Sequence, residues 1–228
     1  MAFAIQYLKR MVSLPECVEL DEKNIKEIEE RAGSAPSVND WKDNRISELL
    51  NEIKDVNVPE ITDNIGAVLD SDNIRIKFMG TEVCLGPSGF KEGISVWARL
   101  LILIYIKQAG KAPLQEKWIN FRDLRGGSIK AEAFHGECEL EIARLLETDP
   151  IALIDKLTSI GAEKADGFSA DHSFILQALP RIPLLILLWE ADDEFGADCK
   201  VLLDPSAVDY LDIESLCYLG EELVRVLK

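Results

Sequence analysis

The clearest pattern of hydrophobic positions runs from Leu184 to Trp189, in the last quarter of the chain. These six residues are all apolar, without the alternation of a half-exposed strand, and such a run is typical of a strand covered on both faces or of a buried helix. Pro183 has no amide hydrogen and disfavours helix at Ile182, so the chain enters the run in an extended conformation. We therefore predict a central strand over residues 184–190, with residues 199–203 as its antiparallel neighbour.

Other patterns predict the remaining elements. Residues 74–78 alternate with a period of two, and residues 82–85 continue after a turn at Gly80, which predicts a β-hairpin. Residues 94–108 are too continuously apolar for a surface helix and predict a buried helix that ends at Gly110. The sequence also predicts an extended piece over 118–121, helices over 129–148, 150–160 and 213–227, and further strands from about Phe174.

The first 70 residues are more polar than the rest of the chain and have a helical pattern. Residues 21–31 are charged, and residues 44–53 carry a narrow amphipathic stripe. Residues 32–39, between them, have the composition of a linker. We expect an N-terminal helical arm over residues 1–70 and an α+β core domain over residues 71–228, in which a mostly antiparallel sheet has helices packed on one face.

Composition narrows the classes of partner. The chain has 228 residues, of which 47% are hydrophobic and 29% charged, as in an ordinary globular protein. Acidic residues outnumber basic residues by 41 to 25, which gives a formal net charge of −16. This charge opposes binding to nucleic acid, where Lys and Arg neutralise phosphates, and docking on an anionic membrane. We therefore expect neither partner, but a small-molecule ligand or a protein.

The cysteines indicate a reducing compartment. The five cysteines form no CxxC pair, so the sequence shows no zinc ribbon or cluster motif, and it identifies no cofactor. The first twelve residues carry their basic pair after the apolar part, unlike a secretory signal. The longest apolar run, residues 100–106, is far shorter than the ~20 residues that span a bilayer. We expect a soluble, cytoplasmic protein.

An acidic turn, residues 190–198, joins the two predicted strands. Its carboxylates are those of Glu190, Asp192, Asp193, Glu194 and Asp198. Such oxygens bind Mg²⁺ and Ca²⁺, and paired acids serve as general acid and base. The alternative, which we favour, is a solvated loop that keeps a hydrophobic hairpin from aggregating. We expect the ring of Phe195 in this turn to pack back onto the protein.

A basic turn, residues 117–130, is the only local concentration of positive charge. Its basic residues are Lys117, Arg122, Arg125 and Lys130, and the aromatic residues around it are Trp118, Phe121 and Phe134. Gly126 and Gly127 precede a predicted helix, whose exposed amides together with arginine would hold a phosphate or carboxylate. The alternative is that Arg122 and Arg125 form ion pairs with the acidic turn or with the C-terminal helix.

Histidine, cysteine and tryptophan offer weaker candidates. His135 and Cys138 lie three residues apart on one helical face, so a metal pair is conceivable, but two ligands alone make no zinc site. No G-x-S-x-G nucleophile elbow occurs. Tryptophans such as Trp97 and Trp189 belong to a core more often than to a ligand platform.

Three segments resemble a known family. They are WINFRDLRGG at residues 118–127, LPRIPLLILLWEADDEF at 179–195 and LDPSAVDY at 203–210. In this order they resemble the uncharacterised family called domain of unknown function 3786, over roughly residues 74–228. The resemblance implies an origin in anaerobic bacteria or archaea and, from some members, an accessory role in corrinoid-dependent metabolism. Other members are fused to an iron–sulfur segment, for which this chain lacks the cysteines.

We predict a cytosolic binding or accessory module with a pocket for an anionic or polar ligand, because the sheet should bring the basic turn and the acidic turn together. The predicted ligand-binding residues are Trp118, Phe121, Arg122, Arg125, Gly126, Gly127, Trp189, Asp192 and Glu194. Two alternatives stay open. One is a metal-assisted hydrolase that uses residues 190–198, and the other is a pure protein–protein interaction module that docks through its first 70 residues.

Overall fold

The computed structural model describes most of the chain. The described residues are 24–25, 38–54, 57–91 and 93–228. Contacts between residues separate two compact units, residues 1–44 and residues 45–228, so the fold is given for each unit by itself.

The described residues of the first unit are helical. Asn24 and Ile25 are in helical conformation, and residues 38–44 form the beginning of helix α3 (Val38–Lys54). The helix predicted over residues 21–31 and the linker predicted over 32–39 otherwise lie outside the described residues.

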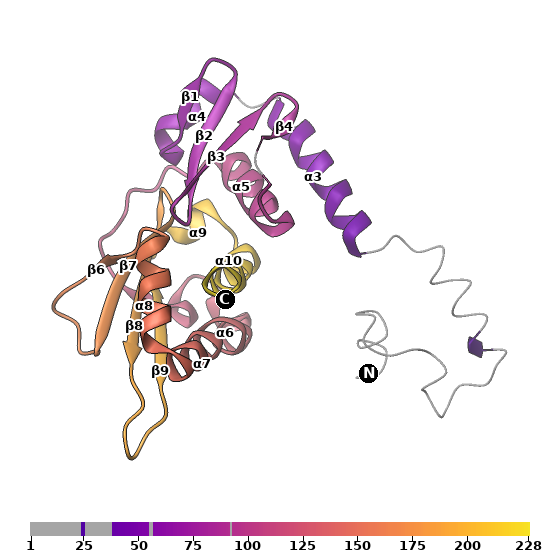
Figure 1. Ribbon diagram of the computed structural model, residues 1–228. Helices are drawn as coiled ribbons and strands as arrows, with labels where there is room; N and C mark the ends of the chain where they lie inside the picture. Colours follow the sequence, from indigo (N-terminus) through magenta and orange to yellow (C-terminus); the bar gives the residue numbers. More distant parts are fainter. Residues whose placement is uncertain (1–23, 26–37, 55–56, 92) are drawn as a thin grey trace. The chain divides into compact units, whose positions relative to one another are not determined.

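A four-stranded antiparallel sheet follows helix α4 (Val58–Ile65) in the second unit (Figure 1). Its strands, in spatial order, are β1 (Val68–Asp70), β2 (Asn73–Phe78), β3 (Thr81–Gly86) and β4 (Gly89–Phe90). Strands β2 and β3 are the predicted hairpin, in which Ile76 pairs with Val83. Both side chains are buried, so the alternation with period two is confirmed as a sheet with one covered face.

A five-stranded antiparallel sheet contains the long apolar run. In spatial order its strands are β5 (Ile119–Asn120), β9 (Asp198–Leu203), β8 (Ile182–Trp189), β7 (His172–Leu179) and β6 (Glu163–Lys164). The central strand β8 is buried from Ile182 to Leu188, as expected where both faces are covered. Strand β9 is its antiparallel neighbour, with Ile186 opposite Val201, so the predicted strand pair is confirmed.

Helices form the other layer of the second unit. They are α5 (Val96–Gln108), α6 (Ala131–Phe134), α7 (Leu140–Thr148), α8 (Pro150–Ser159), α9 (Ala207–Tyr210) and α10 (Ile213–Leu227), and two 3₁₀ turns, η2 (Phe121–Asp123) and η3 (Gly127–Ile129), precede α6. The predicted buried helix is α5, but its last turn is closed by Ala109 in left-handed conformation rather than by Gly110. No helix in the described part of the chain is long and apolar enough to cross a membrane.

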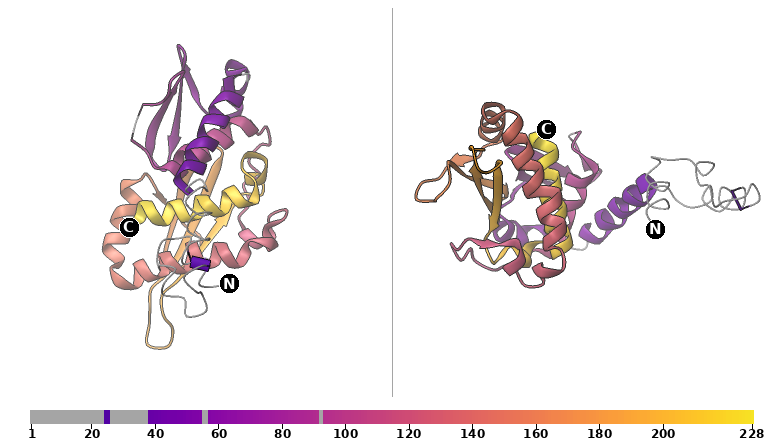
Figure 2. Two further views of the ribbon diagram at one scale, coloured as in Figure 1. Left: turned by 90° about the vertical axis from the view of Figure 1, so that its right-hand side faces the viewer. Right: turned by 90° about the horizontal axis from the view of Figure 1, so that it is seen from below.

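The helices α6, α7, α8 and α10 cover one face of the five-stranded sheet (Figure 2). Phe174, Ile186 and Val201 lie side by side on β7, β8 and β9, and all three belong to the hydrophobic core. The predicted α+β class, with helices packed on one face of an antiparallel sheet, is confirmed. The strands nevertheless form two sheets, whereas we predicted one.

The second compact unit includes residues before the predicted boundary at residue 70, and that boundary stays a prediction. The second unit starts at Arg45, and Leu49, Ile53 and Ile65 are buried in the hydrophobic core. The amphipathic stripe over residues 44–53 was visible in the sequence, but the pattern does not show which surface will cover it.

Candidate functional site

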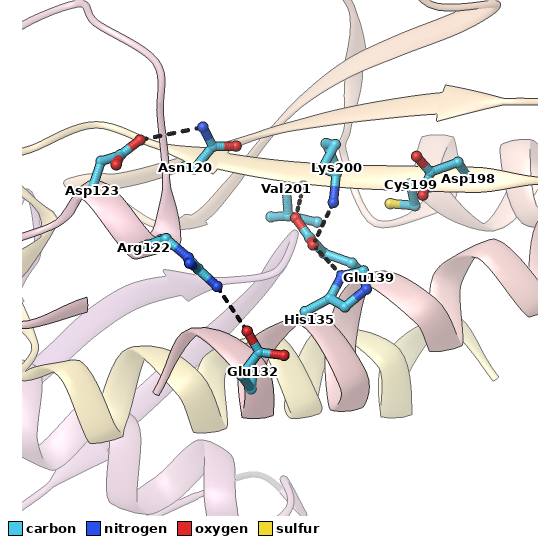
Figure 3. Close-up of polar contacts among 10 residues, drawn as sticks. All are labelled: Asn120, Arg122, Asp123, Glu132, His135, Glu139, Asp198, Cys199, Lys200 and Val201. Carbon is cyan, nitrogen blue, oxygen red and sulfur yellow. Dashed lines mark hydrogen bonds and ion pairs between the residues drawn. The ribbon is translucent and has the colours of Figure 1, made fainter. Parts of the chain in front are cut away.

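A π-helical segment, His135–Glu139, interrupts the helix predicted over residues 129–148. It lies between α6 and α7, so one turn of the helix is widened where it faces strand β9 (Figure 3). Single π turns inside α-helices are rare and frequently occur at functional sites. The segment brings His135 and Glu139 into contact, with 2.7 Å between Nδ1 and Oε2.

Glu139 is a nearly buried carboxylate, with a side chain only 10% exposed. Its Oε1 accepts the backbone N–H of Val201 at 3.1 Å, and its Oε2 accepts from Lys200 Nζ at 3.1 Å. Strand β9 has no strand partner at Val201 on the side away from β8, so the carboxylate satisfies an edge amide. A buried charge is stable only when it is paired in this way.

The same carboxylate sets the tautomer of His135. An ionised carboxylate only accepts hydrogen bonds, so Nδ1 carries the hydrogen and donates it to Glu139. The other nitrogen, Nε2, then holds a lone pair, and no described residue hydrogen-bonds to it. Hydrogen bonds of this kind orient imidazoles that accept protons or bind metals.

His135 and Glu139 line a pocket with a volume of about 390 Å³, within the usual range for small-molecule sites. Its lining residues are Asn120, Phe121, Arg122, Asp123, Ala131, Glu132, Phe134, His135, Glu139 and Lys200. The rings of Phe121 and Phe134 stack with centroids 4.2 Å apart and give the pocket an apolar part. Polar groups from η2, the π-helical segment and β9 surround it (Figure 3).

Arg122 is the most accessible cation of the pocket. Its Nη2 lies 2.7 Å from Glu132 Oε1, and the two side chains are 64% and 86% exposed. Exposed ion pairs of this kind contribute little stability, and the guanidinium keeps further N–H groups for a ligand.

The turn that carries Arg122 is held in place by Gly127. A β-carbon at Gly127 would lie 1.9 Å from the carbonyl oxygen of Phe121, so only glycine fits there.

The pocket carries charges of both signs. Arg122 and Lys200 are the cations, and Asp123, Glu132 and Glu139 are the carboxylates. A purely anionic ligand would therefore meet repulsion as well as attraction. The arrangement suits a polar ligand with one acidic group for Arg122.

Two of the predicted ligand-binding residues, Phe121 and Arg122, line this pocket. The others are absent from its described lining; they are Trp118, Arg125, Gly126, Gly127, Trp189, Asp192 and Glu194. Arg122 pairs with Glu132, not with the acidic turn or the C-terminal helix as suggested above. Lys130, in the same basic turn, does pair with Glu214 on the C-terminal helix. A cavity shared by the basic and acidic turns stays a prediction.

The acidic turn forms the tip of the projecting β8–β9 hairpin (Figure 1). Oδ1 of Asp192 accepts the amides of Glu194 at 2.8 Å and Phe195 at 2.7 Å, and these hydrogen bonds lower the pKa of Asp192. The expectation that Phe195 packs back is wrong, because its side chain is 71% exposed. No described group of three or more His, Cys, Asp or Glu side chains is placed to hold a metal ion.

The second histidine lies at the base of this hairpin. His172 Nε2 is 2.7 Å from Glu190 Oε1, and the indole N–H of Trp189 donates to the carbonyl of Ser169 at 2.8 Å. These contacts link the end of β8 to the segment before β7. His172 is not part of the pocket lining described above.

The buried cysteines offer no reactive thiolate. Burial raises the pKa of the Cys138 and Cys199 thiols well above their ordinary value, and it raises that of Cys217 to about 11. Thiols in this state are poor nucleophiles and metal ligands. Cys138 is fully buried, and Nδ1 of His135 is engaged by Glu139, so the suggested His135–Cys138 metal pair gains no support.

Sequence reasoning missed Glu139 and Lys200 as site residues. One signal was present: Glu139 follows Cys138 and precedes Ile142, two fully buried positions of the same helix, so a carboxylate beside this stripe needed a partner. The partners of Glu139, Lys200 and Val201, come from β9, and Lys200 lies 61 residues later in the chain. No local pattern indicates that pairing.

Comparisons with known proteins give one family and no individual relative. The family model described as Domain of unknown function (DUF3786) matches residues 57–226. That range contains all the residues of the pocket. No curated protein and no solved structure matches the chain.

Proposed function

Because the chain belongs to the family described as Domain of unknown function (DUF3786), whose description assigns no activity, we propose its function from the pocket itself: it is a binding module for a small polar ligand that carries an acidic group. The observation that carries this proposal is the convergence of Arg122, Lys200 and His135 on one pocket of about 390 Å³.

The chemistry of the pocket selects this class of ligand. Arginine binds carboxylate and phosphate through paired N–H groups, and the exposed pair with Glu132 is easily exchanged for a ligand. The buried Phe121–Phe134 stack forms the floor under these polar groups. The carboxylates of Asp123 and Glu139 limit the net charge that the ligand can bring.

Calorimetric titration and thermal shift with a fixed set of probes test the proposal. The set contains inorganic phosphate, succinate, citrate, adenosine monophosphate and cobalamin. We expect at least one of the acid-bearing probes to bind and to raise the melting temperature. Arg122→Ala should weaken that binding tenfold or more, because a charge-assisted hydrogen bond contributes roughly 1.5–3 kcal/mol.

Arg144→Ala is the matched control. Arg144 is also paired with a glutamate, Glu141, its side chain is 67% exposed, and it is absent from the described pocket lining. Its substitution should leave binding unchanged. If no probe binds, or if both variants weaken binding equally, the proposed function is wrong.

The compartment and the corrinoid link belong to the same proposal. A cytoplasmic location is supported by the described cysteines, Cys84, Cys138, Cys199 and Cys217, none of which forms a disulfide. A role near corrinoid chemistry rests on the family resemblance alone, and cobalamin is in the probe set for that reason. Stabilisation by cobalamin that Arg122→Ala leaves unchanged would place a corrinoid site outside this pocket.

A further inference from the structure

We propose that the pocket beside the π-helical segment hydrolyses small esters that carry a carboxylate, with His135 as the general base. This inference rests on the proposed binding function. Acyl hydrolysis needs a base with a free nitrogen, a positive charge for the developing oxyanion and a group that holds the substrate. His135, Lys200 and Arg122, which supply these three, all line the same pocket.

Glu139 prepares His135 for proton transfer. With Nδ1–H donated to the carboxylate at 2.7 Å, the imidazole is held in the tautomer whose Nε2 can take a proton. The carboxylate is itself fixed by the backbone amide of Val201 at 3.1 Å. The position of the base is therefore set by the edge of strand β9 and not by a mobile side chain, which is the preorganisation that catalysis needs.

Lys200 places a positive charge beside the base. Its Nζ and His135 Nδ1 both contact Oε2 of Glu139, at 3.1 Å and 2.7 Å, so the ammonium and the imidazole are neighbours. The ammonium has three N–H groups, and Glu139 accepts from one of them. A second N–H is free to donate to an oxyanion formed next to the imidazole.

Arg122 gives the substrate its orientation. It comes from η2, on the side of the pocket formed by the segment after β5, whereas His135 and Lys200 come from the π-helical segment and β9 (Figure 3). A substrate carboxylate bound by the guanidinium leaves the ester group to reach the imidazole and the ammonium. The Phe121–Phe134 stack lies along the same pocket.

The step balances without a further reactant. His135 Nε2 takes a proton from water, and the water oxygen forms a bond to the acyl carbon while the carbonyl electron pair moves to oxygen. The oxyanion is stabilised by Lys200. When the carbonyl re-forms, the bond to the alcohol oxygen breaks, and that oxygen takes the proton back from Nε2. The products are a carboxylic acid and an alcohol.

Two chromogenic esters of similar length test the proposal on the full chain. They are mono-p-nitrophenyl succinate, which carries a free carboxylate, and p-nitrophenyl butyrate, which does not. We expect faster release of p-nitrophenol from the succinate ester. His135→Gln, whose amide can still donate to Glu139, should lower kcat for this ester about a hundredfold or more.

The second histidine is the matched control. His172 is hydrogen-bonded to a glutamate at the same distance, 2.7 Å, but lies outside the described pocket lining, so His172→Gln should keep the wild-type rate. Arg122→Ala should raise KM for the succinate ester and leave the butyrate ester unaffected.

The outcomes separate the two proposals. Binding of succinate without hydrolysis of its ester, or equal rates for His135→Gln and His172→Gln, overturns the catalytic inference and leaves the binding function standing. Failure of the whole probe set to bind overturns both. Hydrolysis that depends on His135 but not on Arg122 would show that the substrate carboxylate is not what the pocket recognises, and it would overturn the assigned substrate class.

Discussion

The carboxylate of Glu139 accepts the backbone amide of Val201 at 3.1 Å, from a strand that begins almost sixty residues later in the chain. This hydrogen bond joins the π-helical segment to the edge of the five-stranded sheet. It fixes the carboxylate that His135 and Lys200 both contact.

Removing this carboxylate should destabilise the fold as well as the site. Glu139→Ala leaves the Val201 amide and the Lys200 ammonium without their acceptor, and we expect the free energy of unfolding to fall by roughly 3 kcal/mol. Urea denaturation followed by circular dichroism measures the change. Glu132→Ala, at an exposed ion pair, should cost less than about 1 kcal/mol, and similar losses for the two variants would contradict the structural role of Glu139.

The two histidines should have opposite tautomers. His135 donates from Nδ1 to Glu139, and His172 donates from Nε2 to Glu190. Long-range proton–nitrogen NMR spectra of the neutral imidazoles distinguish the two forms, and His172→Gln assigns the signals. Finding His135 with its hydrogen on Nε2 would remove the basis for its role as a base.

Asp204 should make stability depend on acid pH. This carboxylate is buried and accepts the amides of Gln115 and Ser206, each at 2.9 Å, and the hydroxyl of Ser206 at 2.6 Å. Burial alone would raise its pKa, but these hydrogen bonds outweigh burial and lower it. Because the pKa of Asp204 is lower in the folded than in the unfolded chain, where it is about 3.9, this carboxylate stabilises the fold at pH values above that unfolded pKa. The contribution is lost as the pH falls through the folded pKa.

Asp204→Asn tests this dependence. The variant should be less stable than the wild type at neutral pH by roughly 2 kcal/mol, and the difference should shrink as the pH falls below about 4. Thermal unfolding across that pH range measures it. Asp209→Asn, at an exposed position of α9, should follow the wild type at every pH, and a constant difference between Asp204→Asn and the wild type would refute the assignment.

Two glycines near the pocket should respond in opposite ways to alanine. At Gly127 a β-carbon would lie 1.9 Å from the Phe121 carbonyl oxygen, whereas at Gly136 nothing lies within 4 Å. Gly127→Ala should therefore displace η2 and weaken both folding and ligand binding. Gly136→Ala should stabilise the helix by up to about 1 kcal/mol. Denaturation midpoints compare them, and a neutral Gly127→Ala would show that η2 tolerates displacement.

Local patterns in the sequence were sufficient where burial alone decides the structure. The apolar run after Pro183 became the central strand, the alternation over residues 74–78 became a hairpin strand, and the continuously apolar residues 94–108 became α5. In each case the side chains themselves indicate how much of the element is covered. The net charge and the absence of a CxxC pair are also read directly from the sequence.

The pocket was predictable only in part. Phe121 and Arg122 were chosen because basic and aromatic residues cluster there, and both line the pocket. The acidic turn was chosen for its charge, but Asp192 uses its carboxylate to cap its own turn. A count of charges cannot distinguish a carboxylate that binds a ligand from one that accepts local amides.

The sequence by itself determined strands β2, β3, β8 and β9, helices α5, α8 and α10, and the α+β class, because hydrophobic spacing reflects which face of each element is buried. Only the tertiary structure decided that the strands form two sheets, that one helical turn widens at His135–Glu139, and that this turn meets the edge of β9. The physical reason is that the Val201 amide, which lies beyond the short pairing of β5 with β9, and the desolvated carboxylate that satisfies it exist only after the chain has folded.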